Sequence, residues 1–190
     1  IVSLAILSLF CIKSNTMENG FIFLNVIQPG ILGMKDFNNR TQAFIDKNLA
    51  NLAANSITSI LPESALYNYD FNRDYLHLNQ HENLIIGGTI RNNSLVYNAA
   101  VHMGRDFETE EYRKIYLTPI QEDSWIQKGY SQQTNTFTIE GYKIGIAICY
   151  EAAFPRIAYK SVINKAQANI LLSNTQSYNA IQMQYRVLRI

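Results

Sequence analysis

The amino-acid sequence predicts an α/β fold, in which a central sheet is covered by helices. Two observations lead to this class. Short apolar segments typical of buried strands recur along the chain, and a segment with the period of an amphipathic helix lies between them. The chain has 190 residues, of which 47% are hydrophobic and 16% charged. It can therefore bury a sizeable core, and its length favours a single domain.

The elements of the first half are predicted in the order strand, helix, strand, strand, strand. Residues 21–29, FIFLNVIQP, are predicted as a strand, and residues 41–55 as a helix with apolar residues at i, i+4 and i+7. The segment ITSILPESA is predicted as a strand that ends at Pro62. Residues 83–90 and 95–103 are predicted as two further strands, and the turn-like sequence RNNS between them indicates a hairpin.

The segment GYKIGIAICYEAAFP, residues 141–155, is predicted as a buried strand that ends at Cys149. Its large apolar residues alternate on one face, whereas the other face carries Lys143, Gly145 and Ala147 before the thiol. These small residues leave room for a molecule to approach the thiol. A thiol at the start of a helix also has its thiolate favoured. The alternative is that Cys149 is a small hydrophobic residue of the core.

A helix is predicted to follow Cys149, over residues 153–168. Glu151 and Pro155 are residue types that favour the first turn of a helix. The segment NILLS, residues 169–173, is then predicted as a strand, which continues the alternation of strands and helices.

The first twelve residues, IVSLAILSLFCI, form an uncharged apolar run that stops at Lys13. The run is shorter than the roughly 20 residues that span a bilayer. We interpret residues 1–13 as the end of a longer transmembrane helix. The core of a signal peptide and a buried strand or helix of a soluble protein are the alternatives.

Several classes of function find no support in the sequence. The formal net charge is +1 and no basic run occurs, so nucleic-acid binding is not expected. Two cysteines rule out a disulfide framework. His77 and His81 lack an obvious third ligand, so neither a metal site nor a cofactor is expected. Gly87 and Gly88 are not followed by a phosphate-loop sequence and indicate a bulge or close backbone packing instead.

Three segments that follow predicted strand ends carry residues capable of chemistry. They are LPESA with Glu63, YRKIYLTPIQED with Lys114 and Glu122, and ICYEAAFP with Cys149. In this order they resemble the Glu-Lys-Cys triad of the nitrilase, or carbon–nitrogen hydrolase, superfamily. The ICYE..FP form around the cysteine and the spacing of Lys, Leu, Pro and Glu after residue 113 are most similar to the apolipoprotein N-acyltransferases.

The resemblance implies a role for each residue of the triad. Glu63 would act as the general base that takes the proton from Cys149, the nucleophile. Lys114 and the backbone amide of Tyr150 would stabilise the oxyanion that forms when sulfur attacks an acyl group. Taken alone, Glu63 would be interpreted as a solvated carboxylate and Lys114 as a surface lysine.

Three further positions match residues that support the site in this superfamily. Glu122 would orient Lys114 or the acyl group, and Tyr150 and Glu151 would support the turn that carries the nucleophile. The implied architecture is a nitrilase-like α-β-β-α sandwich over residues 21–190, incomplete at its C-terminus, in which case this chain alone is expected to be inactive.

The resemblance implies an apolipoprotein N-acyltransferase of the bacterial inner membrane, with its catalytic domain on the periplasmic side. Cys149 would take an acyl chain from a phospholipid donor and pass it to the α-amine of a lipidated apolipoprotein acceptor. The segment SNTQSYN has Ser177, Tyr178 and Asn179 where that family carries Trp, Phe and Gly, which counts against a lipid substrate. A soluble amidase of the same superfamily and an inactive truncated member remain as alternatives.

Overall fold

The computed structural model describes residues 8–13, 21–26, 58–69, 83–104 and 109–173. Strands of a first sheet are β1 (Ser8–Lys13), β2 (Phe21–Val26), β3 (Thr58–Tyr69), β4 (Leu84–Asn92), β5 (Leu95–Met103) and β6 (Thr109–Arg113). Strands of a second sheet are β7 (Thr136–Ile139), β8 (Tyr142–Ile148) and β9 (Ala168–Leu172). Two helices, η2 (Cys149–Ala153) and α2 (Pro155–Ile163), follow β8.

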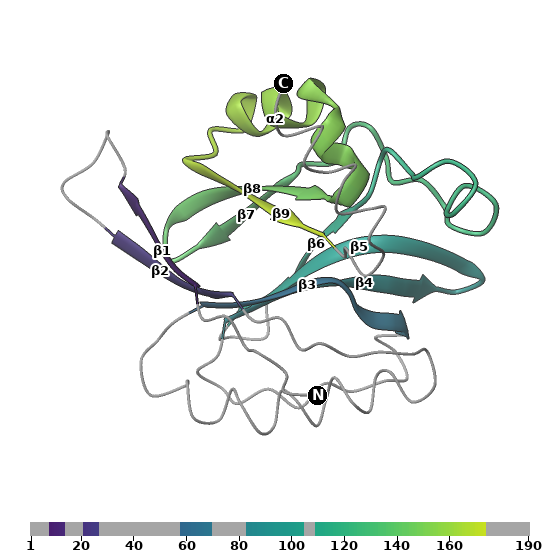
Figure 1. Cartoon of the computed structure of the whole chain (residues 1–190), viewed down its shortest axis with the longest axis horizontal. Helices are drawn as coiled ribbons and strands as arrows, with labels where there is room; N and C mark the ends of the chain where they lie inside the picture. Colours follow the sequence, from purple (N-terminus) through teal and green to yellow (C-terminus); the bar gives the residue numbers. More distant parts are fainter. Residues whose placement is uncertain (1–7, 14–20, 27–57, 70–82, 105–108, 174–190) are drawn as a thin grey trace.

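The two sheets are stacked face to face. The first has the strand order β1-β2-β3-β4-β5-β6 and the second the order β7-β8-β9. Figure 1 shows the second sheet above the first, with α2 on the outer side of the second sheet. These elements form three layers of the expected α-β-β-α sandwich, whereas the helix expected over residues 41–55 lies outside the described residues.

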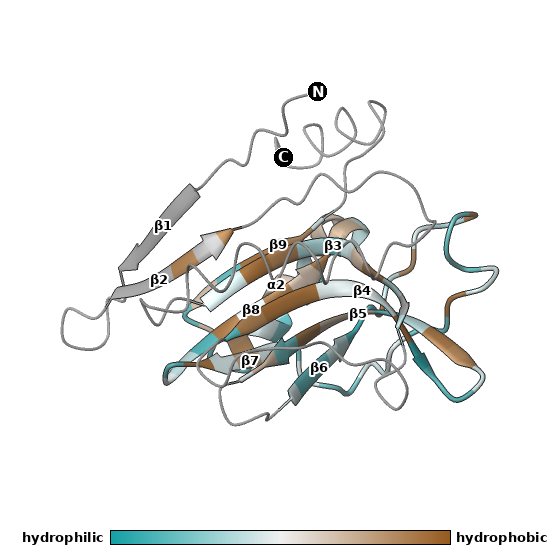
Figure 2. Cartoon of the chain, turned by 90° about the horizontal axis from the view of Figure 1, so that it is seen from below, coloured by the Kyte–Doolittle hydropathy of each residue, from teal (hydrophilic) through white to brown (hydrophobic). Residues whose placement is uncertain are grey.

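The core between the sheets follows from the two-residue period of the strands. Ile85 and Ala100 of the first sheet belong to one apolar cluster with Ile144, Ile146 and Ile148 of β8. In Figure 2 the hydrophobic colour is strongest along β8 and β9. The residues next to Ile85 and Ala100 in sequence point to the opposite face, where they belong to a second cluster: Leu84, Ile86, Ala99 and Val101. We call the face toward the second sheet the inner face.

The structure corrects the interpretation of the N-terminal apolar run. Ser8–Lys13 forms strand β1, paired antiparallel with β2 from Ser8 opposite Val26 to Lys13 opposite Phe21. Pairing with β2 provides the backbone hydrogen bonds that a helix would otherwise make within itself. Among the described residues, no helix is long and apolar enough to cross a membrane.

The predicted hairpin is confirmed. Strands β4 and β5 pair in register from Leu84 opposite Met103 to Asn92 opposite Leu95. The connecting loop has two residues, and Asn93 adopts a left-handed φ of 56°, which asparagine tolerates better than most residues. The strand expected to end at Pro62 instead continues to Tyr69.

The strand before Cys149 is also confirmed, but the helix after it is shorter than expected. Pro155 occupies the first turn of α2, and the helix ends at Ile163 rather than at residue 168. It ends there because Lys165 adopts a left-handed φ of 63° and the Gln167 N–H already donates to the carbonyl of Lys143, 2.8 Å away, beside β8.

The room expected beside Gly145 does not lead to the thiol, because α2 fills it. A Cβ at Gly145 would lie 2.5 Å from the hydroxyl oxygen of Ser161 on α2 and 2.0 Å from the side-chain oxygen of Asn169. The small residues of this face of β8 therefore allow the helix to pack closely, and they do not form a path for a substrate.

Candidate active site

A bulge in β3 positions Glu63. Leu61 pairs with Ile86, but the next paired residue, Leu66, lies opposite Gly88, so β3 has three more residues than β4 over this interval. In a regular strand Glu63 would share the outward face of Leu61. The bulge, in which Ser64 has a φ of 63°, turns Glu63 toward the inner face.

The two glycines of β4 make this bulge possible. A Cβ at Gly87 would lie 2.8 Å from the Cα of Glu63, and a Cβ at Gly88 would lie 2.5 Å from the Cβ of Leu66. Both distances are too short for real atoms. The close backbone packing predicted at Gly87 and Gly88 is thus confirmed, and it occurs next to Glu63.

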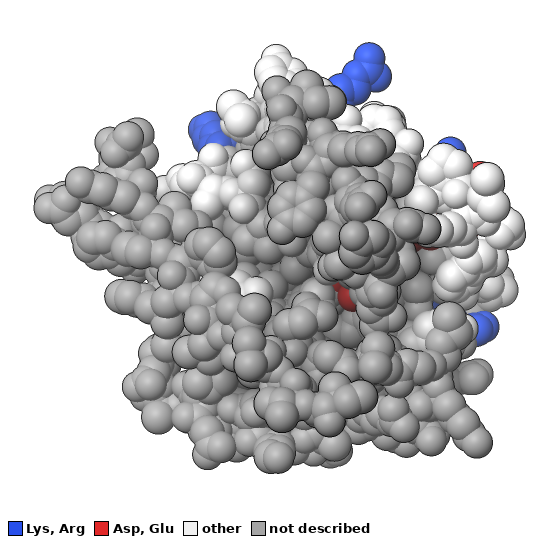
Figure 3. Space-filling model, viewed as in Figure 1, with Lys and Arg blue, Asp and Glu red and all other residues white. Residues whose placement is uncertain are grey.

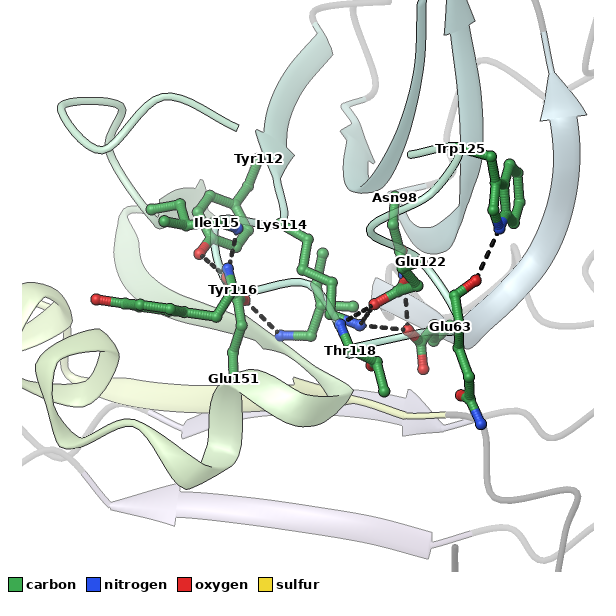
Figure 4. Close-up of polar contacts among 12 residues, drawn as sticks. Glu63, Asn98, Tyr112, Lys114, Ile115, Tyr116, Thr118, Glu122, Trp125 and Glu151 are labelled. Atoms are coloured by element: carbon green, nitrogen blue, oxygen red, sulfur yellow. Dashed lines mark hydrogen bonds and ion pairs between the residues drawn. The ribbon is translucent and has the colours of Figure 1, made fainter. Parts of the chain in front are cut away.

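Lys114 follows the last residue of β6, and its Nζ lies between two carboxylates. It donates to Oε1 of Glu63 at 3.1 Å and to Oε2 of Glu122 at 2.8 Å (Figure 4). Only 1% of Lys114 is exposed, against 7% of Glu63 and 9% of Glu122. The backbone N–H of Lys114 donates to the carbonyl of Asn98 at 2.8 Å, which extends the pairing of β5 and β6 by one residue.

Glu122 belongs to the turn that follows Thr118. Its Oε2 accepts hydrogen bonds from both Lys114 Nζ and the backbone N–H of Thr118, the latter at 2.7 Å. Its own backbone N–H donates to the carbonyl of Thr118 at 3.0 Å. Glu122 therefore joins the turn to the lysine, and its orienting role stays a prediction.

The charges of the cluster outweigh the effect of burial on its pKa values. Burial alone would lower the pKa of Lys114, but the carboxylates of Glu63 and Glu122 raise it above its ordinary value. Burial alone would raise the pKa of Glu122, but the charge of Lys114 and the hydrogen bonds from Lys114, Thr118 and Asn98 lower it. Lys114 and Glu122 are thus a stable ion pair near neutral pH.

Cys149 is the first residue of η2 and is half-buried. Its φ of 46° lies in the left-handed region, which is strained for a cysteine and turns the chain sharply out of β8. Its thiol hydrogen-bonds with the side chains of Glu63 and Ser173. The structure therefore brings Glu63, Lys114 and Cys149 together at one place.

The expectation of a favoured thiolate is wrong. Burial and then the charge of Glu63 raise the pKa of Cys149 to about 11, although Lys114 and Ser173 act in the opposite direction. The thiol is consequently protonated near neutral pH. The carboxylate of Glu63 is in hydrogen-bond contact with the thiol and could accept its proton.

Glu151 connects η2 to the segment that follows Lys114. Its Oε1 accepts hydrogen bonds from the backbone N–H of Ile115 at 2.7 Å and from the hydroxyl of Tyr112 at 2.8 Å (Figure 4). Its Oε2 accepts the N–H of Ile148 at 2.9 Å, just before Cys149. Glu151 is 0% exposed, and burial raises its pKa despite these hydrogen bonds.

Tyr150 lies in an aromatic group beside Cys149. Its ring meets Phe154 edge to face, with 5.2 Å between the ring centroids, and Phe154 stacks on Tyr116 at 4.1 Å. Its backbone N–H belongs to the first turn of η2, where N–H groups have no partner within the helix. The oxyanion contact expected of this amide stays a prediction.

Sequence reasoning missed two residues of this site, Asn98 and Tyr112. Asn98 is 4% exposed, and its Nδ2 donates to Glu63 Oε1 at 2.8 Å and to Glu122 Oε1. A signal was present, because asparagine is depleted in buried strands and interrupts the apolar segment LVYNAAVHM. Tyr112 gave no such signal, since tyrosine is common in strands.

The described part of the chain offers no group of ligands for a metal ion. No group of three or more His, Cys, Asp or Glu residues there could hold a metal ion. His77 and His81 lie outside the described residues. On the face drawn in Figure 3, the coloured Lys and Arg side chains lie apart from one another.

Comparisons with known proteins show the family of the chain. The carbon–nitrogen hydrolase family model matches residues 59–188. The chain therefore belongs to the carbon–nitrogen hydrolase family, within the nitrilase superfamily. It is 29% identical over 125 residues to the probable hydrolase YhcX of Bacillus subtilis, a match that covers 64% of this chain and 23% of YhcX.

Solved structures share the fold at low sequence identity. A carbon–nitrogen hydrolase from Helicobacter pylori G27 has a TM-score of 0.63 at 18% identity, over 87% of this chain and 65% of that one. Nit3 of Saccharomyces cerevisiae, a member of branch 10 of the nitrilase superfamily, has a TM-score of 0.63 at 19% identity, over 85% and 67%. An amidase from Nesterenkonia sp. has a TM-score of 0.63 at 13% identity, over 83% and 67%.

Proposed function

We propose that this protein transfers acyl groups through a thioester on Cys149. The observation that carries the proposal is that Glu63 contacts both other residues of the triad. Its carboxylate hydrogen-bonds with the Cys149 thiol, and its Oε1 lies 3.1 Å from the Nζ of Lys114. A base beside a protonated thiol and a buried cation beside that base are the groups that acyl chemistry on sulfur requires.

In the first half-reaction, the sulfur of Cys149 bonds to the carbonyl carbon of the donor while Glu63 takes the thiol proton. The carbonyl oxygen becomes an oxyanion, which Lys114 and the backbone N–H of Tyr150 stabilise. The bond between the carbonyl carbon and the leaving group then breaks, and Glu63 returns the proton to the leaving group. The product is a thioester on Cys149.

In the second half-reaction, the acceptor attacks the thioester. Glu63 takes a proton from the acceptor as the new bond forms, and it returns this proton to the sulfur as the carbon–sulfur bond breaks. An amine acceptor gives an amide, and water gives a free acid. The triad performs the same proton transfers in both cases, so the acceptor decides between a transferase and a hydrolase.

We favour an N-acyltransferase that takes an acyl chain from a phospholipid and transfers it to the α-amine of a lipidated N-terminal cysteine. The proposal is supported by the resemblance of ICYEAAFP and KIYLTPIQE to the apolipoprotein N-acyltransferases. It implies that the protein acts at the bacterial inner membrane, with this domain on the periplasmic side.

The second candidate is an amidase that hydrolyses a small amide. It is favoured by the amidase from Nesterenkonia sp., which has the same fold, and by the name of YhcX, a probable hydrolase. It is also favoured by Ser177, Tyr178 and Asn179, which differ from the aromatic sequence of the acyltransferases.

The thioester is tested by giving the full-length protein a phospholipid donor without acceptor. Intact-mass measurement should find an acyl adduct that hydroxylamine removes and that is absent in Cys149→Ala. Cys11→Ala is the matched control, since it removes the other cysteine of the chain, and it should leave the adduct unchanged. An adduct on any residue other than Cys149 would contradict the mechanism.

The acceptor separates the two candidates. An α-amine has a pKa of about 7.7 to 8.0 and is partly neutral near pH 7, whereas a lysine side chain has a pKa of about 10.4. A peptide with a lipidated N-terminal cysteine should therefore be acylated much faster than internal lysines. Rapid release of free acid with no dependence on the amine, together with turnover of small amides, would identify an amidase.

A further inference from the structure

Asn98 lies at the centre of the cluster that it forms with Glu63, Lys114 and Glu122. It belongs to β5 and lies two residues before Ala100, so both residues are on the inner face of the strand. Its side-chain Nδ2 donates to Oε1 of Glu63 at 2.8 Å and to Oε1 of Glu122 (Figure 4). Its backbone carbonyl accepts the backbone N–H of Lys114 at 2.8 Å. Asn98 thus contacts Glu63, Glu122 and Lys114 from a single position on β5.

We propose that Asn98 is a positioning residue that holds the general base Glu63 and the orienting Glu122 in their catalytic geometry. This inference rests on the proposed function, because it assigns Asn98 a part in forming the thioester. Asn98 acts through the two carboxylates.

The fixed orientation of Glu63 is the first argument. The terminal torsion of a glutamate is broad and does not select one orientation of the carboxylate by itself. Two donors, Asn98 Nδ2 and Lys114 Nζ, bind the same oxygen of Glu63 at 2.8 and 3.1 Å. Two hydrogen bonds to one oxygen from different segments of the chain restrict this torsion, so the base stays aligned with the thiol.

The chemistry of the amide is the second argument. Glu63, Glu122 and Lys114 together carry a net charge of minus one when both glutamates are ionised. A second cation in place of Asn98 would neutralise the cluster and weaken the base, and a third carboxylate would repel the other two. The side-chain amide of asparagine offers two N–H donors without charge, one for each glutamate.

The unsatisfied oxygen of Asn98 is the third argument. Among the described residues, its Oδ1 is one of three buried side-chain atoms without a hydrogen-bond partner. Rotation of the amide would direct Oδ1 at two carboxylate oxygens, so the observed orientation is the one that serves the glutamates. A buried asparagine selected for stability alone would have its oxygen satisfied as well.

Asn135 shows this contrast within the same chain. It is 0% exposed, and its Nδ2 donates to the carbonyls of Ile146 and Ile157 and to the hydroxyl of Ser161. Its Oδ1 accepts a hydrogen bond from Asn164 at 3.3 Å. Asn135 thus joins β8 to α2 with both polar atoms of its side chain paired. Its side chain bonds to no carboxylate among the described residues, which makes it a matched structural control.

The test compares Asn98→Ala with Asn135→Ala in the full-length protein. In Asn98→Ala, kcat for thioester formation should fall by about 100-fold, since a displacement of roughly 1 Å can have this effect. KM should change little, because Asn98 does not contact the donor in this proposal. The acidic limb of the pH profile of kcat should move to higher pH by roughly one unit, as expected when a charged group loses a hydrogen bond.

Asn135→Ala should lower the melting temperature while leaving kcat and the acidic limb as in the unaltered protein. The inference is overturned if Asn98→Ala retains kcat and the acidic limb, or if Asn135→Ala changes both to the same extent. Partial recovery of kcat in Asn98→Ser, which restores one donor, would support it.

A second measurement does not depend on turnover. Carbon-13 NMR of the glutamate carboxyls, with Glu122 assigned through Glu122→Gln, should show a higher Glu122 pKa in Asn98→Ala than in the unaltered protein. An unchanged Glu122 pKa overturns the inference even if the protein is inactive. A raised Glu122 pKa in Asn98→Ala, combined with an unaltered protein that forms no thioester, would support the contact made by Asn98 and reject the proposed function.

Discussion

Two buried carboxylate arrangements lie near Cys149, and they are built in opposite ways. Glu63 and Glu122 share the cation of Lys114, and they are 7% and 9% exposed. Glu151 is 0% exposed and forms no ion pair within the described part; backbone N–H groups and the hydroxyl of Tyr112 hold it instead.

The pKa values respond accordingly. The charge of Lys114 lowers the pKa of Glu122 despite burial, whereas burial raises the pKa of Glu151 despite its hydrogen bonds. The first arrangement keeps charge available beside the thiol. The second uses a carboxylate to fix two backbone segments, one before Cys149 and one after Lys114.

Removal of the shared cation should have the largest effect. Lys114→Met removes the cation that two buried carboxylates share, so the free energy of unfolding should fall by about 3–5 kcal/mol and thioester formation should be lost. One of the two carboxylates should then retain a proton, with a raised pKa. Stability in urea should therefore increase as the pH is lowered from about 8 to about 5, because a raised pKa stabilises the protonated folded state.

Lys128→Met is the control for this change. Lys128 is exposed, and a surface substitution of this kind should change the free energy of unfolding by less than about 0.5 kcal/mol. If Lys114→Met unfolded at the same urea concentration as Lys128→Met, the carboxylate pair would not depend on the cation.

The second arrangement should respond less strongly to the loss of its charge. Glu151→Gln keeps the shape of the side chain but directs an NH₂ group at backbone N–H donors, which should reduce the free energy of unfolding by about 1–3 kcal/mol. The acidic limb of thioester formation should stay where it is, because Glu151 contacts neither Glu63 nor Lys114. Urea unfolding and a pH profile measure the two effects.

Glu111→Gln provides the comparison, since Glu111 is an exposed partner of Arg113 and such pairs contribute little. A shift of the acidic limb in Glu151→Gln would mean that Glu151 takes part in the proton transfers, and the distinction between the two arrangements would fail.

The smallest expected effect is the loss of the stability that ionised Glu122 contributes at acid pH. The folded pKa of Glu122 lies below the ordinary value of 4.5, so the unfolded chain binds more protons there. The stability that this carboxylate contributes is complete above the unfolded pKa and is lost as the pH falls through the folded pKa. Between about pH 5 and about pH 3, unfolding free energy should decline more steeply in the unaltered protein than in Glu122→Gln. Parallel curves would show that Glu122 is not stabilised in its ionised form.

The order of the motifs along the chain was enough to predict much of the site. Glu63, Lys114, Glu122 and Cys149 follow predicted strands, and chemistry gathers at strand ends in α/β folds. The sequence could predict that these residues lie together because each of them stands in a short motif that is recognisable from its neighbours. The β4–β5 hairpin and the alternation of β8 were equally local, and both are confirmed.

Other features depended on contacts between distant segments. Regular alternation would direct Glu63 outward, and only the bulge against Gly87 turns it inward. The space beside Gly145 looks open in the sequence, but Ser161 of α2 fills it. The apolar run that we interpreted as a membrane helix contains β1, because pairing with β2 overrides a local pattern that also fits a helix.

By itself, the sequence determined the strand periods, the turn residues and the order of the reactive groups, since each of these depends on neighbours within a few positions. The tertiary structure decided the protonation of Cys149 and the place of Asn98. A local pattern suggested a thiolate, whereas burial beside Glu63 raises the pKa of the thiol to about 11. Burial and the approach of charges from β3, β5 and β6 act through space, and the sequence around each residue carries no record of those distances.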